Sequence, residues 1–265
     1  GERPVCGDRV LWEPAAGGGG RVLAVRPRRN LLARPDGRGG QRPLAANLDR
    51  VVVVVAPDPP LQELLLDRYL VAAEHFAIPA AVLLNKTDLL PGPALDTLVE
   101  RLAPYADLGY PLRLASTRAG TGVDGVGALL AGGRSMLVGQ SGVGKSSLIR
   151  ALAPDAPVAV GALSAATGHG RHTTSATTLY PLPGGGELVD SPGVRDFGLW
   201  HLPPEALARG YVELREPAGR CRFRDCSHRH ELDCGVREAL ARGGVAAARY
   251  ARYCRLREQL EAPPT

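Results

Sequence analysis

The pattern of apolar and polar positions along the chain changes character near residue 50. Residues 1–50 are rich in Gly, Pro and Arg and carry short β-like runs such as "DRVLWEP" and "GRVLAVRP". The glycines at positions 17–20 are typical of a hairpin loop. We therefore predict a small β-barrel, or part of one, over residues 1–50.

Residues 51–202 show the alternation of a layered α/β domain. The run "VVVVVAP" that begins at Val51 is apolar throughout, as expected of a strand covered on both faces of a parallel sheet. Residues 61–76 have helical periodicity, and residues 177–183 predict an added strand at one edge of the sheet. Helical segments separate several of the remaining predicted strands, which indicates a doubly wound α/β fold. These strands are predicted at residues 80–86, 111–116, 135–140 and 187–193.

Residues 203–265 have no strand pattern and predict helices around a cluster of cysteines and histidine. No apolar stretch reaches the roughly 18 residues that cross a bilayer, and no signal peptide is visible. We therefore expect a cytoplasmic protein with no membrane partner. The chain starts at Gly1 and its only methionine is Met136, so we expect that the natural N-terminus is not included. The formal net charge of +5 permits an acidic partner without requiring one.

A phosphate-binding loop is predicted between a strand and a helix at residues 136–150. The sequence "MLVGQSGVGKSSLIR" there matches the pattern G-x-x-x-x-G-K-[ST]. Glycines permit a tight turn whose backbone N–H groups surround phosphates, and the helix that follows adds the positive end of its dipole. Lys145 would reach the β- and γ-phosphates, and Ser146 would bind Mg²⁺. The predicted nucleotide contacts are Gly139, Ser141, Gly142, Val143, Gly144, Lys145, Ser146 and Ser147.

The base of the nucleotide is predicted from "NKTD", residues 85–88, at the end of an apolar strand. The Asp88 carboxylate can accept hydrogen bonds from guanine N1–H and from its 2-amino group, and adenine offers neither donor there. Asn85 would brace the loop and contact the purine edge, and the stem of Lys86 would cover the face of the ring. Backbone donors for guanine O6 are expected from "LAST", residues 114–117, among them Ser116.

Two further motifs are those of a nucleotide switch. "DSPG" follows an apolar run, and we expect Asp190 to hold Mg²⁺ through water and the Gly193 N–H to contact the γ-phosphate. The polar, glycine-rich segment "GHGRHTTSATT" lies between the phosphate loop and this motif. Thr173 or Thr174 would complete the Mg²⁺ ligands, and Thr174 is the preferred candidate.

The order of these motifs along the chain is unusual. The two base motifs come first, followed by the phosphate loop, the first switch and the second switch, whereas most guanine-nucleotide switches begin with the phosphate loop. A parallel sheet can be cut at one loop and joined at another without losing its strands or its site. The order therefore predicts a circularly permuted P-loop GTPase domain.

At this point the chain resembles the circularly permuted bacterial GTPases of the RsgA (YjeQ) type, which act in maturation of the small ribosomal subunit. The resemblance implies an N-terminal OB-fold over residues 1–50, the permuted GTPase over 51–202 and a C-terminal zinc module over 203–265. An OB-fold needs five strands, for which 50 residues are short, so the completeness of the barrel stays open. "HTTS" also replaces a longer threonine run that is common in the family. The stretches that carry the resemblance include "RPRRNLLARP", "LLNKTDLL", "GQSGVGKSSLI", "DSPGVRDFGLW" and "CRFRDCSHRHELDCGV".

A structural zinc site is predicted from Cys221, Cys226, His228 and Cys234, which follow the spacing C-x4-C-x-H-x5-C. Three thiolates and one imidazole form a complete tetrahedral set with no open position for water. We expect one Zn²⁺ per chain and interpret His230, which lies outside the pattern, as a surface residue.

The last helices carry six arginines, and arginine-rich faces can bind RNA phosphates. The sequence alone leaves this reading and a merely solvated helix face equally open, and the family resemblance favours RNA. Because "DSPG" leads directly towards the zinc module, we also hypothesise that the nucleotide state sets the pose of that module. The arginines are Arg237, Arg242, Arg249, Arg252, Arg255 and Arg257.

The catalytic group for hydrolysis is not supplied by the usual switch residue. Many Ras-like switches place a glutamine directly after the DxxG glycine, but here that position is Val194, which cannot hydrogen-bond water. His172, beside the switch threonines, is the best candidate within the chain, because imidazole can orient water or accept its proton near neutral pH. A solvated loop histidine or an rRNA contact is the alternative.

We therefore expect a monomeric, ribosome-stimulated GTPase that binds the 30S subunit and its 16S rRNA and assists late maturation. An RNA-binding assembly chaperone that uses GTP mainly as a structural ligand is the alternative. An ATP-dependent enzyme is disfavoured by "NKTD".

Overall fold

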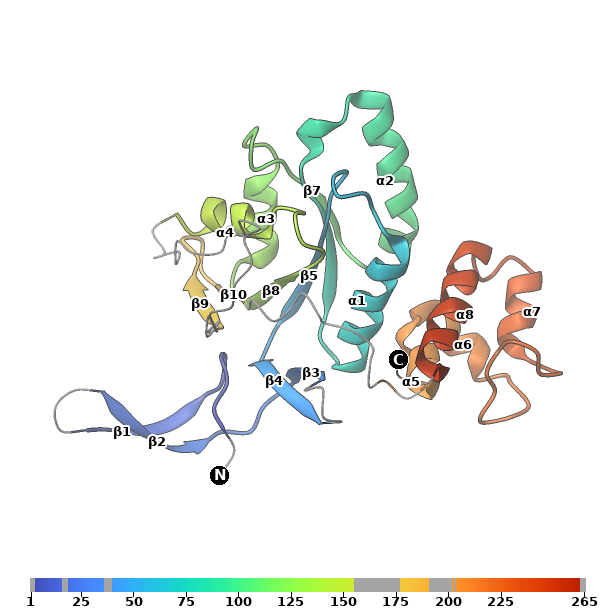
Figure 1. Ribbon diagram of the computed structural model, residues 1–265, viewed down its shortest axis with the longest axis horizontal. Coiled ribbons are helices and arrows are strands. Elements are labelled where there is room, and N and C mark those ends of the chain that lie inside the picture. Colours follow the sequence, from blue (N-terminus) through green and yellow to red (C-terminus); the bar gives the residue numbers. More distant parts are fainter. Residues whose placement is uncertain are drawn as a thin grey trace, which may run out of the picture.

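The centre of the molecule is a six-stranded, mostly parallel β-sheet (Figure 1). A computed structural model describes residues 3–15, 19–35, 40–154, 177–190, 202 and 204–262. Five strands of the sheet run parallel, and β9 is an antiparallel edge strand, as the sequence predicted. In spatial order the strands are β7 (Leu112–Leu114), β6 (Ala80–Leu84), β5 (Arg50–Val55), β8 (Arg134–Val138), β10 (Glu187–Asp190) and β9 (Thr178–Pro181).

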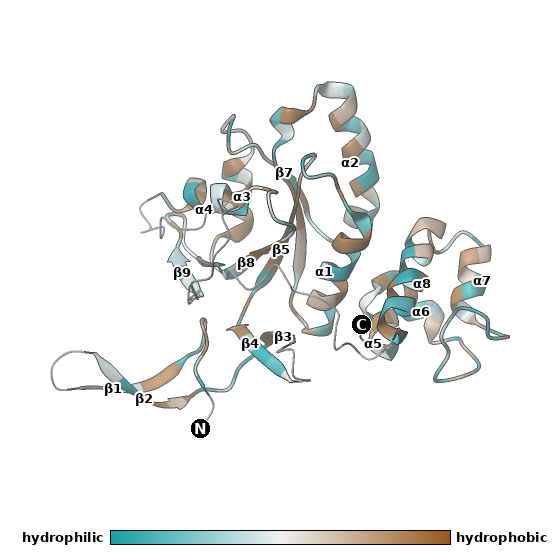
Figure 2. Cartoon of the chain, viewed as in Figure 1, coloured by the Kyte–Doolittle hydropathy of each residue, from teal (hydrophilic) through white to brown (hydrophobic). Residues whose placement is uncertain are grey.

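Helices cover both faces of the sheet, which confirms the predicted α/β layering. On β5, Val51, Val53 and Val55 belong to the same buried cluster as helices α1 and α2, whereas Val52 and Val54 pack with α3 and α4. Both sides of this strand are buried, so its residues are apolar without alternation, and Figure 2 shows the central strands in brown. The helices are α1 (Glu63–His75), α2 (Gly92–Asp107), α3 (Val123–Leu130) and α4 (Lys145–Leu152), and a 3-10 turn, η1 (Thr87–Leu89), follows β6.

The described N-terminal residues do not close into a barrel. Four strands pair antiparallel as two separate two-stranded sheets, β1 with β2 and β3 with β4. Both hairpins lie beyond one end of the central sheet (Figure 1). The five-stranded OB-fold is therefore not confirmed, because neither hairpin pairs with the other to complete a circuit within residues 3–15, 19–35 and 40–46. The strands are β1 (Val10–Pro14), β2 (Gly20–Val25), β3 (Leu31–Pro35) and β4 (Gln41–Ala46).

After the sheet the described chain is helical and packs against α1 (Figure 1). We call residues 204–262 the C-terminal module. No helix in the described part of the chain combines the length and apolar character of a membrane span. The elements of the C-terminal module are α5 (Pro204–Gly210), η3 (Val212–Leu214), α6 (Arg215–Ala218), α7 (Gly235–Ala241) and α8 (Ala247–Glu261).

A buried ionic network joins α1 to α8. The Asp67 carboxylate on α1 is fully buried and accepts hydrogen bonds from Arg249 and, at 2.6 Å, from Arg252 Nε. Arg249, only 4% exposed, also donates to Glu213 at 2.6 and 3.1 Å. Two tyrosines complete the shell of Asp67, because the hydroxyls of Tyr105 and Tyr211 donate to its oxygens at 2.6 and 3.3 Å.

This network corrects the prediction of a six-arginine RNA face. Arg249 and Arg252 bind acidic side chains within the protein, and Arg257 is buried and donates to Glu261 at 2.8 Å. Arg249 and Arg257 are therefore buried and Arg252 is half-buried, so these three of the six arginines do not belong to an external face. The arginines that remain exposed are Arg237, Arg242 and Arg255.

Candidate functional site

The predicted nucleotide motifs lie together at the carboxyl ends of the parallel strands. Parallel strands end at the same edge, where ligands bind in doubly wound folds. The loops that follow β6, β7 and β8 hold "NKTD", "LAST" and the phosphate loop, and β10 ends at Asp190 beside β8. Motifs that lie far apart in the sequence are thus brought together by strand pairing.

The phosphate loop needs glycine at two close approaches. Gly139 and Gly144 have φ angles of 140° and 96°, which L side chains seldom adopt. A Cβ atom at Gly139 would lie 2.2 Å from the Val54 carbonyl oxygen, and one at Gly144 would lie 2.3 Å from Asn85 Nδ2. The loop therefore passes directly over the central strand and against the base motif, and α4 begins immediately after it at Lys145.

The Lys145 side chain folds back over this loop. Its ammonium group donates to the carbonyl oxygens of Gly139 and Gln140 at 2.6 and 2.7 Å. The positive charge thus lies at the mouth of the turn whose backbone N–H groups would surround a phosphate. Ser146 and Ser147 lie in the first turn of α4, where the helix presents its positive end.

Asn85 ties the base motif to the phosphate loop. Its side chain is fully buried, and Nδ2 donates to the Val143 carbonyl oxygen at 2.9 Å. The amide nitrogen carries two hydrogens, so a second N–H is left for the purine edge. The buried Oδ1 has no hydrogen-bond partner among the described residues. One side chain thus fixes the base loop and the phosphate loop relative to each other.

Lys86 is positioned by the loop between β5 and α1. It has a left-handed backbone with φ of 61°, and its ammonium group donates to the Asp58 carbonyl oxygen at 2.8 Å. Anchoring the ammonium group restricts the four-carbon stem that is expected to cover the base. The same loop borders the phosphate loop, because a Cβ atom at Gly142 would lie 3.4 Å from Pro59.

Ser116 contacts the base motif through its side chain. Its hydroxyl donates to Asp88 Oδ1 and accepts a hydrogen bond from the Ala119 N–H at 3.0 Å. The backbone N–H of Ser116 donates to the Thr121 carbonyl oxygen at 2.9 Å, so it is already used. The predicted Ser116 donor for guanine O6 is therefore already occupied, and Thr117 is the next residue of this loop.

Several predicted contacts lie outside the described residues. These are His172, Thr173 and Thr174 of the first switch, and Gly193 of the second.

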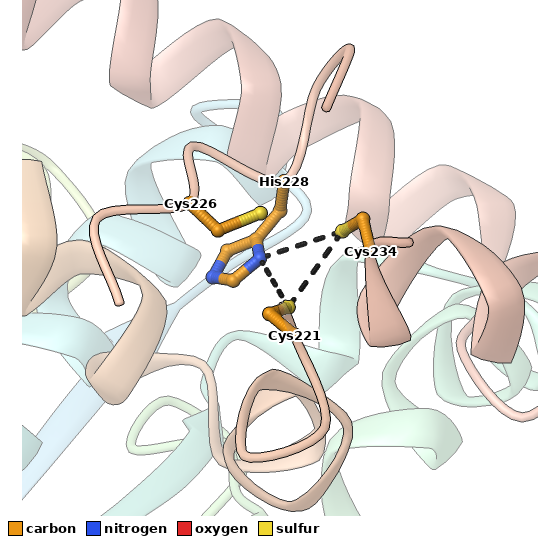
Figure 3. Close-up of side chains that lie close together, drawn as sticks. All are labelled: Cys221, Cys226, His228 and Cys234. Atoms are coloured by element: carbon orange, nitrogen blue, oxygen red, sulfur yellow. Dashed lines mark hydrogen bonds between the residues drawn. The ribbon is translucent and has the colours of Figure 1, made fainter. Parts of the chain in front are cut away.

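The four predicted metal ligands converge in the C-terminal module (Figure 3). Their ligand atoms all lie within 4.8 Å of one another. Cys221 Sγ lies 3.4 Å from His228 Nδ1 and 3.9 Å from Cys234 Sγ, and the last sulfur lies 3.6 Å from Nδ1. Tetrahedral Zn²⁺ with its usual bond lengths separates two sulfurs by about 3.8 Å and sulfur from nitrogen by about 3.6 Å. The side chains therefore fit such an ion, and no acidic side chain belongs to the set.

Burial shapes the chemistry of these ligands. It raises the pKa of the Cys226 thiol to about 12 and lowers the pKa of His228. The histidine is therefore neutral at physiological pH, as a ligand must be, whereas a bound metal must displace protons from the thiols. His230 is exposed, as predicted.

Comparison with known families supports these motifs. The model of the family described as RsgA GTPase matches residues 25–200. The chain is 50% identical over 251 residues to a protein named small ribosomal subunit biogenesis GTPase RsgA from Chromohalobacter salexigens, covering 94% of this chain and 73% of that protein. A protein of the same name from Azotobacter vinelandii is 48% identical, with coverage of 98% and 76%.

Two solved structures have the same architecture. YjeQ from Thermotoga maritima has a TM-score of 0.80 and 31% identity and covers 99% of this chain and 86% of its own. YloQ, described as a circularly permuted GTPase, has a TM-score of 0.78 and 26% identity, with coverage of 100% and 84%. The predicted circular permutation is thus confirmed.

Proposed function

Since this chain belongs to the RsgA GTPase family, we propose that it hydrolyses GTP to GDP and phosphate during maturation of the small ribosomal subunit. The observation that carries the proposal is the hydrogen bond from Asn85 to Val143, which joins a guanine-type base motif to a phosphate loop. The names of the relatives support the same activity and the same ribosomal partner.

Guanine is selected by Asp88, whose carboxylate accepts from N1–H and the 2-amino group of the base. The Ser116 hydroxyl donates to one oxygen of that carboxylate and so orients it. Thr117 supplies the backbone donor for O6, and Asn85 supplies its second amide N–H to the purine edge. An adenine base offers no donor to Asp88, so it would cover this carboxylate without pairing with it, and that penalty makes the discrimination large.

The phosphates occupy the loop from Gly139 to Ser147, and Lys145 moves from the loop carbonyls to the β- and γ-phosphates. Ser146 at the start of α4, Asp190 at the end of β10 and Thr174 supply oxygen donors of the kind that Mg²⁺ prefers. When bound, the ion neutralises charge on the β- and γ-phosphates. Gly193 contacts the γ-phosphate through its backbone N–H.

His172 orients the attacking water, because Val194 offers no hydrogen bond at the usual glutamine position. We expect His172→Ala to lose at least 100-fold in ribosome-stimulated turnover, the usual scale for a positioned acid–base group, with GTP affinity unchanged. Full stimulated turnover of this variant at saturating 30S subunits would remove His172 from the mechanism. A group of the ribosome or a bound ion would then be the better candidate.

The Cys/His cluster holds one Zn²⁺ per chain as a structural ion. Metal analysis of protein purified without chelators should find one zinc, and Cys226→Ser should loosen the C-terminal module without loss of nucleotide binding. A zinc-free, folded protein would contradict this assignment.

The small subunit and its 16S rRNA are the partners, and the chain acts as a monomer in the cytoplasm. The decisive experiment measures GTP hydrolysis alone, with 30S and with 50S subunits. We expect only 30S subunits to raise turnover, by about 100-fold or more. Equal turnover in all three would instead favour a chaperone that uses GTP as a structural ligand, which the relatives named as GTPases do not favour.

A further inference from the structure

We infer that Glu231, which lies between two of the metal ligands in the sequence, is the positioning residue of the metal site. This inference rests on the proposed zinc site and adds to it a residue outside the ligand set. Glu231 is not a ligand itself. It acts on the turn that presents Cys226 and His228 to the ion.

The carboxylate of Glu231 accepts hydrogen bonds from three backbone N–H groups of this turn. Ser227 N–H donates to Oε1 at 2.6 Å, and the N–H groups of Arg229 and His230 donate to Oε2 at 3.1 and 3.2 Å. These donors flank His228 on both sides. Concavities lined by successive backbone N–H groups bind anions, and here a side chain of the protein supplies the anion.

The turn needs such support because His228 has a φ of 62°. Non-glycine residues seldom adopt this left-handed conformation unless the surroundings impose it. Reversing the chain at His228 points its imidazole towards Cys221 and Cys234, with Nδ1 at 3.4 and 3.6 Å from their sulfurs. Without the carboxylate, three N–H groups of the turn would lose their partner together.

Helix α8 holds the same turn from the other side. The hydroxyls of Tyr250 and Tyr253 donate to the carbonyl oxygens of His228 and Ser227 at 2.6 and 2.9 Å. The carbonyls are thus fixed by α8 and the N–H groups by Glu231. Burial by itself would raise the pKa of Glu231, but the hydrogen bonds from Ser227 and its neighbours outweigh burial and hold that pKa below its usual range. The carboxylate of Glu231 is therefore ionised at every pH at which the thiols and the imidazole can bind zinc.

The test compares zinc affinity in Glu231→Gln and Glu231→Ala with that of the unsubstituted chain of residues 1–265. Metal is removed under reducing conditions and Zn²⁺ is returned in competition with a chromophoric chelator. Removing a partner that orients a ligand typically costs 10- to 100-fold in metal affinity, and we expect a loss of that size in both variants. Asp225→Asn is the matched control, since Asp225 is an exposed carboxylate in the same loop, and it should stay within threefold.

Two readouts separate positioning from a general loss of folding. In the zinc-loaded Glu231→Gln variant, the amides of Ser227, Arg229 and His230 should exchange hydrogen faster. With Co²⁺ in place of Zn²⁺, the visible bands should move away from those of the wild-type site as His228 leaves its place. Affinity for a fluorescent GDP analogue should be unchanged.

The outcomes are distinct. Zinc affinity within threefold of wild type and an unchanged Co²⁺ spectrum in both variants would overturn the inference. A parallel fall in GDP affinity would also overturn it, because the effect would then be general. A wild-type chain that binds no zinc would instead defeat the proposed zinc site.

Discussion

Replacing Asp67 by asparagine removes the central charge of the network between α1 and the C-terminal module. The substitution preserves the size and shape of the side chain, so packing changes little. It leaves two guanidinium groups, Arg249 and Arg252, facing a neutral amide at a site that is fully buried in the native protein. The hydroxyls of Tyr105 and Tyr211 would lose an ionised acceptor as well.

The expected loss in the free energy of unfolding depends on which partners Arg249 and Arg252 keep after the substitution. Breaking a buried ion pair by removing one partner costs about 3–5 kcal/mol, because the other charge stays buried without compensation. Arg249 keeps its two hydrogen bonds to Glu213, and Arg252 keeps Glu63 at 2.8 Å. We therefore expect a loss near the lower end, about 3 kcal/mol, which is a large part of the roughly 5–15 kcal/mol that stabilises a typical protein.

The assay is urea unfolding of the zinc-loaded chain, followed by far-ultraviolet circular dichroism. Asp233→Asn is the control, because its ion pair with Arg222 has both side chains 66% exposed, and exposed pairs contribute about 1 kcal/mol or less. A double-mutant cycle with Arg249→Met isolates the pairwise energy, which we expect to exceed about 1 kcal/mol. GDP affinity should change little, since the side chains that donate to Asp67 come from α2, α8 and the turn before η3 and not from the nucleotide loops.

A loss below about 1 kcal/mol in Asp67→Asn, equal to that of the exposed control, would refute this reasoning. A coupling energy of zero with Arg249→Met would refute it independently. Either result would mean that the network contributes little to holding the C-terminal module on α1.

Three further predictions test the nucleotide site and the N-terminal region. Asp88→Asn should weaken GDP binding and favour xanthine nucleotides, whose 2-oxo group accepts from the new amide; unchanged affinity in a nucleotide competition assay would remove Asp88 from the site. Gly144→Ala should weaken GDP binding at least about tenfold, a cost of about 1.4 kcal/mol, because its Cβ would lie 2.3 Å from Asn85 Nδ2; Gly127→Ala on α3, with only a 3.9 Å contact, is the control. Burial would raise the pKa of the Asp8 carboxyl, but hydrogen bonds to it, chiefly from the Arg28 side chain, outweigh burial and lower that pKa. Its folded-state pKa therefore lies below the unfolded value of about 3.9, so the stability that it contributes is present above about pH 4 and is lost as the pH falls. Chemical unfolding at pH 7 and pH 3 should show a deficit in Asp8→Asn at pH 7 that shrinks at pH 3, and a deficit independent of pH would contradict this.

The features that sequence predicted well are local in the chain. The apolar run at 51–55 became a central strand because both of its faces are covered, and the glycines at Gly139 and Gly144 are required by close approaches that a motif records. Strand lengths were less predictable. Residues 111–116 predicted a strand, but only Leu112–Leu114 pair with β6, because pairing ends where the loop turns towards Asp88.

The arginines of α8 show where local reasoning failed. A run of arginines favours a solvated or RNA-facing helix, but Arg249, Tyr253, Leu256 and Arg257 are the buried residues of this helix. These four residues recur at helical spacing and therefore share one face of α8. Tyr253 and Leu256 indicate in the sequence that this face points inward, and the two arginines lie on the same face. The partner that makes burial of Arg249 favourable is Asp67, 182 residues earlier, and no local pattern connects them.

Because of the permuted order, the contact between Asp67 and Arg249 joins the beginning of the α/β domain to the last helix of the chain. In the chain, the α/β domain begins with β5 and α1, and the C-terminal module follows the end of that domain. The ionic network nevertheless brings the last helix, α8, onto the first helix of the α/β domain, α1. The loop before α1 also holds Lys86 of the base motif through Asp58, so α1 is tied to the base motif at one end and to α8 along its side. Deleting the module would leave the Asp67 carboxylate without either arginine and would expose the face of α1 that now packs against α5. The helical module is therefore part of what stabilises the GTPase domain, and the hypothesis that nucleotide state sets its pose requires breaking this network.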